Sequence, residues 1–198
     1  MLNTVYRLVA PRRFEVEFND IDLHAGQIVV RPTHLSICHA DQRYYQGVRP
    51  AEVLKEKLPM ALTHEGLGEV LYDPTGTYQC GDTVIMIPNT PCEKDEVIAE
   101  NYLRSSKFRA SGFDGFMQEH VALDIDRVVP VDDSIDKVIA AFTELVSVSV
   151  HAIRRFDSIA HKRRKAVGIW GDGNLGYITA IFFKAMFPNT KLYILGVD

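Results

Sequence analysis

The chain has 198 residues, of which 46% are hydrophobic and 24% charged, and these fractions are typical of a globular protein. Its 22 Lys and Arg residues against 26 Asp and Glu residues give a net charge of −4, which disfavours binding to nucleic acids or anionic membranes by phosphate neutralisation. No signal-peptide pattern and no apolar run of membrane-spanning length is visible, and three cysteines are too few for a disulfide framework. We therefore expect a soluble cytoplasmic protein with reduced thiols.

The first two thirds of the chain have the pattern of a β-rich domain. Strands are predicted at residues 14–18, 27–30, 67–72 and 83–87, and Pro32 is expected to end the second of them. Closely spaced strands with turn residues between them predict a small barrel. The polar, irregular stretch 89–115 is predicted to be an excursion from that barrel.

Helical periodicity begins after residue 130. A helix is predicted at residues 135–142, capped from within residues 132–134, and a second helix extends to about residue 156. The basic run 161–165 is predicted to be a solvated loop. A strand at 166–170, a glycine-rich turn, a helix ending near residue 186 and a strand at 191–195 then form one β-α-β unit. We place the domain boundary between residues 1–150 and residues 151–198.

The turn after the strand at 166–170 has the sequence G-x-G-x-x-G. It follows an apolar strand and opens a helix, which is the context in which this pattern binds a dinucleotide. Gly171 permits a tight turn, Gly173 lets the backbone approach a pyrophosphate, and Gly176 lets helix and strand pack closely. The N–H groups at the helix start then face the anion. The predicted cofactor-binding residues of the turn are Gly171, Gly173, Asn174, Leu175 and Gly176.

The end of the strand at 191–195 predicts which dinucleotide is bound. An acidic side chain there would accept hydrogen bonds from the adenosine ribose of NAD(H). Gly196 occupies that place and leaves room for the 2′-phosphate of NADP(H), while Asp198 is the alternative acid. We therefore expect NADP(H) in preference to NAD(H).

Three residue types that bind zinc occur upstream of this turn. Cys38, His64 and Glu144 supply a thiolate, an imidazole and a carboxylate, and three such ligands with one open position form a catalytic zinc site. Glu144 interrupts an apolar stretch, where a carboxylate is costly unless it is paired or bound to a metal.

Each residue also has a structural interpretation when it is considered alone. Cys38 is explained equally well as a core thiol and His64 as a hydrogen-bonded core histidine. Glu144 is explained as the ion-pair partner of Arg154 or Arg155. The metal hypothesis therefore rests on the three occurring together upstream of a dinucleotide turn.

The order of these motifs resembles that of the zinc-dependent medium-chain dehydrogenases, in their sorbitol-dehydrogenase-like branch. The resemblance covers essentially the whole chain, and it implies a GroES-like β-barrel domain that carries zinc, followed by the first β-α-β unit of a Rossmann domain. The shared motifs are Cys-x-x-Asp at 38–41, His-Glu-Gly-x-Gly-x-Val at 64–70, Gly-Asp-x-Val at 81–84, Glu144 with His151-Ala152, and the glycine turn.

The resemblance implies roles for individual residues. Cys38 and His64 correspond to zinc ligands, while Glu65 and Glu144 compete for the third protein position. Asp41 matches a residue that orients the ligand histidine. Many relatives have Ser or Thr where this chain has alanine at position 40, so the substrate proton must pass through the zinc-bound water, Glu144 or a neighbour such as His39.

The residues around Cys38 and the glycine turn resemble most the members of that family that interconvert D-ribulose 5-phosphate and D-ribitol 5-phosphate with a nicotinamide cofactor. This implies a pentose phosphate substrate, a functional link to a cytidylyltransferase that makes CDP-ribitol, and a place in teichoic-acid or capsule synthesis. A homo-oligomer is expected for the full-length protein. The alternatives are a zinc dehydrogenase of another polyol or alcohol, or a non-catalytic binding module. Candidate phosphate-binding cations are Arg43, Arg49, Lys107 and Arg109.

Two further departures from the family pattern carry expectations. Many relatives hold a structural zinc on four cysteines in the segment that corresponds to residues 89–115, where this chain has only Cys92, so one zinc is expected and not two. Family chains also continue well beyond this length. The chain is therefore expected to be a fragment that contains an incomplete Rossmann domain.

Overall fold

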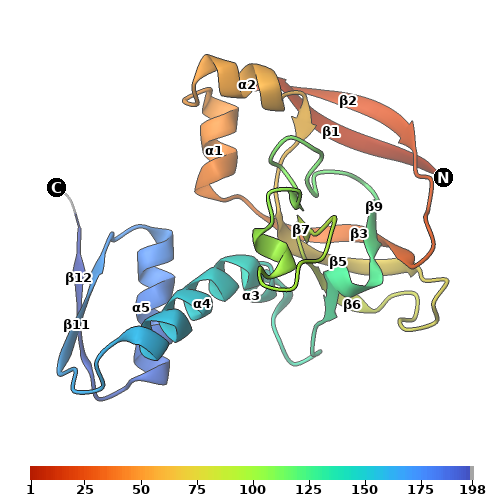
Figure 1. Cartoon of the computed structure of the whole chain (residues 1–198). Coiled ribbons are helices and arrows are strands. Elements are labelled where there is room, and N and C mark those ends of the chain that lie inside the picture. Colours follow the sequence, from red (N-terminus) through yellow and green to blue (C-terminus); the bar gives the residue numbers. More distant parts are fainter. Residues whose placement is uncertain (197–198) are drawn as a thin grey trace. The chain divides into compact units, whose positions relative to one another are not determined.

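The computed structural model describes residues 1–196 and consists of two compact units, Met1–Phe142 and the residues from Thr143 onward (Figure 1). The boundary predicted at residue 150 falls inside a continuous helix, α4 (Thr143–Ile159). Asp198, the alternative ribose-binding acid, lies outside the described residues. Within the described part, no helix combines the length and the apolar character that crossing a membrane requires.

A five-stranded antiparallel sheet forms the centre of the first unit. Its strands lie in the order β10, β6, β5, β3, β9, so that consecutive neighbours are hydrogen-bonded. Ile28, Val29 and Val30 of β3 are all buried, as the short apolar run in the sequence predicts, and Ile28 and Val30 belong to the core. The bounds are β3 (Gln27–Ser36), β5 (Glu65–Tyr72), β6 (Thr83–Met86), β9 (Val121–Asp124) and β10 (Val128–Pro130), and a short 3-10 helix, η2 (Ile125–Arg127), joins the last two.

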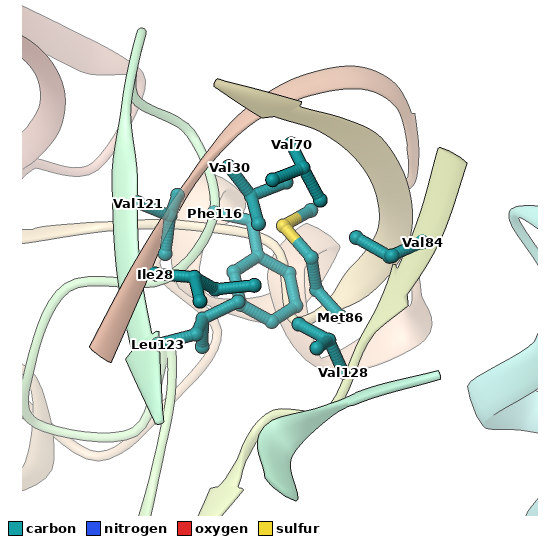
Figure 2. Close-up of a cluster of buried hydrophobic side chains, with 9 residues drawn as sticks. All are labelled: Ile28, Val30, Val70, Val84, Met86, Phe116, Val121, Leu123 and Val128. Carbon is teal, nitrogen blue, oxygen red and sulfur yellow. The ribbon is translucent and has the colours of Figure 1, made fainter. Parts of the chain in front are cut away.

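Nine buried side chains form the core that this sheet encloses. Figure 2 shows them pointing toward one another, with the ring of Phe116 among the aliphatic chains. Phe116 is completely buried and contributes the largest side chain of the cluster. The members are Ile28, Val30, Val70, Val84, Met86, Phe116, Val121, Leu123 and Val128.

A second layer contains a three-stranded sheet in the order β2, β1, β4 and two helices. Leu8 and Met60 from this sheet pack with Tyr44 and Leu62 in a separate buried cluster. The bounds are β1 (Leu2–Ala10), β2 (Arg13–Asp20), β4 (Met60–Ala61), α1 (His39–Gln46) and α2 (Ala51–Lys57).

The prediction that Pro32 ends its strand is wrong. β3 continues to Ser36, and its pairing with β5 shifts register between Pro32 and His34. Proline lacks the N–H that a regular ladder requires. Pro32 lies beyond Val30, the last residue of β3 that pairs with β9, and directly before the bulge, whose unpaired residue is Thr33, so the ladder is irregular where the N–H is missing. The strand therefore extends beyond Pro32 and leads the chain toward Cys38.

The excursion predicted at residues 89–115 leaves the sheet and returns to it. Its base is a two-stranded ladder of β7 (Asn89–Thr90) and β8 (Lys107–Phe108), and it contains the 3-10 helix η1 (Glu100–Tyr102). The guanidinium of Arg109 donates to the carbonyl oxygens of Asp114 at 3.2 Å and Ala122 at 2.8 Å. Hydrogen bonds of the Arg109 side chain thus connect the excursion to the rest of the first unit.

The predicted helix at 135–142 is shorter than expected and has a different cap. It forms only α3 (Lys137–Ala140), and its N-cap is Asp136, whose carboxylate accepts from the N–H groups of Val138 and Ile139. The carboxylate of Asp132 instead accepts from Ser134 within the preceding turn. A nearer side chain with the right geometry therefore caps the helix in place of the predicted group.

The second unit contains the predicted β-α-β arrangement. Strands β11 (Ala166–Trp170) and β12 (Lys191–Leu195) pair in parallel, and α5 (Asn174–Met186) connects them. Helix α4 packs against α5, where the hydroxyls of Thr179 and Ser149 form a hydrogen bond of 3.1 Å.

The basic run at 161–165 is only partly solvated, contrary to the prediction. Arg164 forms an ion pair with Asp157, and its guanidinium lies 5.0 Å from the ring centroids of Phe156 and Phe187. Its side chain is 12% exposed. Arginine can bury its stem and stack its planar head on aromatic rings, so one member of a charged run belongs to the packed interior.

Truncation of the central core ring should destabilise the chain strongly. We expect Phe116→Ala to lower the free energy of unfolding by about 3–5 kcal/mol, because a fully buried ring leaves a cavity that its neighbours cannot fill. Urea unfolding followed by circular dichroism measures the change. The matched control is Phe18→Ala on the exposed face of β2, which should cost less than about 1 kcal/mol; equal losses in the two variants would contradict the assignment of this core.

Candidate functional site

Cys38 lies at the junction between β3 and α1. It is the N-cap of α1, where its Sγ atom accepts the backbone N–H of Asp41 at 3.5 Å. The carboxylate of Asp41 in turn accepts the backbone N–H of Cys38 at 3.1 Å. This reciprocal capping box fixes the backbone of the predicted thiolate ligand.

His64 and Glu65 lie at the start of β5. The three residues before them pair with residues 115–117: Phe116 N–H donates to the Thr63 carbonyl at 2.7 Å, and Gly115 N–H donates to the Ala61 carbonyl at 2.8 Å. Thr63 has a φ of 64°, in the left-handed region that a β-branched residue seldom adopts. A strained turn therefore directs His64 and Glu65 away from the line of the preceding strand.

These two segments bring three predicted residues together. One ligand atom from each of Cys38, His64 and Glu65 lies within 4.8 Å of the other two, and His64 Nε2 lies 4.0 Å from Glu65 Oε1. The first two side chains are partly exposed, whereas Glu65 is 1% exposed. Sulfur, imidazole nitrogen and carboxylate oxygen are the donors that zinc prefers in catalytic sites.

The buried polar atoms of the cluster fit a cation. Among the described residues, neither His64 Nδ1 nor Glu65 Oε2 has a hydrogen-bond partner, although both atoms are buried. Burial raises the pKa of the Cys38 thiol to about 12, so the protein alone does not hold it as a thiolate at neutral pH. A divalent metal would deprotonate the thiol and compensate the buried carboxylate, and the residues present therefore fit zinc.

The hydrogen bonds of Asp41 add a role to the one that the family resemblance implied. Its two carboxylate oxygens accept backbone N–H groups, Oδ2 from Cys38 at 3.1 Å and Oδ1 from Thr63 at 2.9 Å. The imidazole of His64 is not among its hydrogen-bond partners. Through these two bonds Asp41 positions the backbone on both sides of the cluster.

Two further predicted residues are not among the three that converge within the first unit. His39, the first residue of α1, has an exposed side chain. Glu144 lies in the first turn of α4, in the second unit, and is partly exposed. Val148 on the same helix is 41% exposed, so the apolar sequence around Glu144 is not a buried core within its unit. Glu144, unlike Glu65, is therefore not a buried carboxylate within its own unit.

One predicted phosphate-binding cation has another function. Arg109 is partly buried, its guanidinium donates to two backbone carbonyls, and desolvation lowers its pKa to about 10. The guanidinium lies 5.4 Å and 5.7 Å from the ring centroids of Phe113 and Phe116. These contacts give Arg109 a structural function in the excursion.

One residue that touches the cluster, Phe108, was not predicted from the sequence. The ring of Phe108 lies against the imidazole of His64, with ring centroids 5.1 Å apart and planes inclined at 65°. Phe108 ends β8 within the irregular excursion. A lone aromatic in a polar stretch gives no periodicity that would distinguish this contact from ordinary packing.

The glycine turn has the geometry that its sequence predicts. Gly171 has a φ of 119°, and its N–H donates to the Leu195 carbonyl at 2.8 Å, which joins the turn to the end of β12. A side chain at Gly176 would place its Cβ 1.9 Å from the Gly171 carbonyl oxygen, whereas the space beside Gly173 is open. Gly173 is the N-cap of α5 and provides no side-chain cap, so the first N–H groups of the helix remain available to an anion.

Gly196 follows β12, but the space beside it is filled. A Cβ atom there would lie 2.2 Å from the carboxylate of Asp172, the second residue of the glycine turn. Gly196 is thus constrained by a neighbour in its own unit. The expected room for a 2′-phosphate is consequently bordered by a carboxylate.

Comparison with known proteins shows which family and fold this chain is similar to. A model of the alcohol dehydrogenase GroES-like domain matches residues 24–133. Ribulose-5-phosphate reductase of Bacillus spizizenii is 56% identical over 99% of this chain and 58% of its own length, and ribulose-5-phosphate reductase 1 of Staphylococcus aureus is 57% identical over the same shares. The chain therefore spans a little over half the length of these curated relatives.

Solved structures give the same fold. The crystal structure of S. aureus TarJ in complex with NADPH is 47% identical, with a TM-score of 0.80 over 100% of this chain and 55% of that chain. L-idonate 5-dehydrogenase of Escherichia coli, at 21% identity, has a TM-score of 0.80 over 100% of this chain and 64% of its own. The predicted architecture, a GroES-like domain followed by the start of a Rossmann domain, is confirmed. Since the domain model covers more than half of the sequence, the chain belongs to the alcohol dehydrogenase GroES-like domain family.

Proposed function

We propose that this chain supplies the metal site and the pyrophosphate-binding turn of an oxidoreductase that interconverts D-ribulose 5-phosphate and D-ribitol 5-phosphate with NADP(H). The observation that carries the reaction type is the cluster of Cys38, His64 and Glu65 in one chain with the glycine turn. The substrate is supported by relatives named ribulose-5-phosphate reductase at 56% and 57% identity. We refer to this below as the reductase proposal.

In this proposal the first unit holds the metal. Cys38 and His64 are two zinc ligands, and Glu65 is the third protein ligand that the first unit itself supplies, with Glu144 as the alternative. When bound, zinc polarises the substrate carbonyl as a Lewis acid and NADPH supplies the hydride. The backbone bonds of Asp41 hold the two ligand-bearing segments in place.

The proton that the substrate oxygen gains or loses must be transferred by a group other than the residue two positions after Cys38. That residue is Ala40, which has no hydroxyl. His39, exposed at the start of α1, can exchange protons with solvent, and Glu144 is the second candidate. We propose that one of these two side chains transfers this proton.

The second unit binds the dinucleotide in this proposal. The uncapped N-terminus of α5 and the open space beside Gly173 suit a pyrophosphate. Gly196 itself brings no acid to the end of β12, although the Asp172 carboxylate borders this position, and the preference for NADP(H) is supported by a relative whose crystal structure contains NADPH. A cation that pairs with the 2′-phosphate would belong to the part of the relatives that this chain does not match.

The setting of the reaction follows from its chemistry. Pentose phosphates and NADP(H) are soluble metabolites, so we place the reaction in the cytoplasm. A cytidylyltransferase that makes CDP-ribitol for teichoic-acid or capsule polymers would consume the product. We also expect the full-length protein to form a homo-oligomer, a prediction that size-exclusion chromatography with light scattering would test.

Zinc binding tests the metal site directly. The chain purified in the presence of zinc and then dialysed should retain one zinc ion, and Cys38→Ala should retain none, because the thiolate is a principal ligand. Elemental analysis measures the ratio. Cys80→Ala and Cys92→Ala are matched controls, since both thiols are exposed and neither belongs to the cluster. Two zinc ions per chain, or full retention by Cys38→Ala, would show that the site is assigned wrongly.

Cofactor and substrate preference test the reaction. A chimera that joins this chain to the unmatched part of the B. spizizenii relative should reduce ribulose 5-phosphate with a higher kcat/KM for NADPH than for NADH. It should also prefer ribulose 5-phosphate to ribulose, because a site built for the phosphate loses binding energy without it. Initial rates measure both ratios. Preference for NADH would indicate that an acid such as Asp198 binds the ribose.

The role of Glu144 can be tested in the same chimera. We expect Glu144→Gln to lower kcat by about 100-fold or more, as loss of a proton-transfer or ligand carboxylate does, while the thermal melting temperature changes little. Glu65→Gln, made in parallel, tests the competing third ligand by zinc retention. Normal turnover and normal zinc content in Glu144→Gln would make Glu144 structural and leave Glu65 as the carboxylate at the metal.

A further inference from the structure

The imidazole of His64 is held without a hydrogen bond. Among the described residues its buried Nδ1 atom has no partner, and Nε2 lies 4.0 Å from the nearest Glu65 oxygen, beyond hydrogen-bond distance. The Asp41 carboxylate accepts the backbone N–H groups of Cys38 and Thr63, and no hydrogen bond from the His64 ring to it is found among the described residues. Polar contacts therefore do not set the rotation of this ring, although a metal ligand requires a defined orientation.

An aromatic contact takes the place of the missing hydrogen bond. The Phe108 ring meets the imidazole in an edge-to-face arrangement, with centroids 5.1 Å apart and planes at 65°. This is the geometry that aromatic pairs prefer, because the positive edge of one ring faces the negative face of the other. The contact limits the rotation of the imidazole about its χ2 angle.

Phe108 can act as a support because its own backbone is fixed on both sides. It pairs with Asn89 in the β7–β8 ladder, and the N–H of Arg109 donates to the Pro88 carbonyl at 3.1 Å. The Arg109 side chain then connects this point to the carbonyls of Asp114 and Ala122. The excursion thus holds one aromatic ring at a defined place beside the metal ligands.

We propose that Phe108 is a positioning residue, which orients the His64 imidazole for metal binding through its ring. The inference rests on the reductase proposal only in taking His64 as a metal ligand. It assigns to the excursion a function at the metal site.

The test compares zinc affinity in variants of the whole chain. We expect Phe108→Leu to weaken zinc binding by about threefold to tenfold in competition with a chelator, the range that loss of one aromatic pair corresponds to. Phe108→Tyr keeps the ring and should stay within about twofold of the unsubstituted chain. With cobalt in place of zinc, the visible absorption spectrum should change in Phe108→Leu and not in Phe108→Tyr, since it reports ligand geometry.

Phe113→Leu is the matched control. Phe113 contacts Arg109 in the same excursion, but no contact with His64 is found for it, so this variant reproduces a disturbed excursion without loss of the ring contact. Its zinc affinity should be unchanged. If Phe108→Leu lowers the melting temperature of the metal-free chain, Phe108→Met fills the volume of the ring without its edge and gives the same comparison.

The outcomes separate the two proposals. Equal zinc affinity and equal cobalt spectra in the unsubstituted chain and Phe108→Leu, or an equal loss in Phe113→Leu, would overturn the positioning role and leave the metal site intact. If the unsubstituted chain bound no zinc, the metal site of the reductase proposal would be wrong, and the positioning role would be wrong along with it.

Discussion

A buried carboxylate reinforces the contact between the two segments that carry the proposed metal ligands. Asp41 is 2% exposed, and its oxygens accept the backbone N–H groups of Cys38 and Thr63, which lie on different elements. These bonds measure 3.1 and 2.9 Å, and a charged acceptor makes them stronger than bonds between neutral groups. They add to the β3–β5 ladder, in which Ser36 pairs with Glu65, so the spacing of the thiol-bearing and imidazole-bearing segments depends on the ladder and on this side chain together. The strained turn at Thr63 persists because the bond from its N–H to Asp41 and the bond from Phe116 to its carbonyl hold the residue on both sides.

The two units place their functional groups by different physical means. In the first, three side chains from separate segments converge only because tertiary hydrogen bonds bring the segments together. In the second, the anion-binding geometry of the glycine turn is almost entirely local, since it follows from the φ of Gly171 and the lack of side chains at Gly173 and Gly176. Local geometry follows from short motifs, and convergent geometry does not.

This difference between local and convergent geometry explains which features could be predicted from the sequence. Three strands of the central sheet (β3, β5 and β6), the β-α-β unit and the glycine turn were predictable, because periodicity and glycine placement act within a few residues. The short strands β9 and β10 were not predicted. Cys38 and His64 were predictable as partners only through their motifs. The extension of β3 past Pro32, the cap at Asp136 and the burial of Arg164 depend on neighbours distant in sequence or on competition between nearby polar groups. The contact of Phe108 with His64 depends on how an irregular segment returns to the sheet, which no local pattern encodes.

The crowding beside Gly196 has a consequence for how the coenzyme preference of such a protein can evolve. The simplest route toward NAD(H) is to place an acid at the end of β12, where it would bind the ribose. Here the first atom of a new side chain would meet the Asp172 carboxylate, which is the end of an exposed side chain and can rotate away, but an introduced acid would still face a like charge. The two positions are therefore coupled: an acid at position 196 is tolerated better once Asp172 has been replaced by an uncharged residue. One contact between a turn and a strand end thus makes the effect of one substitution depend on whether the other has been made.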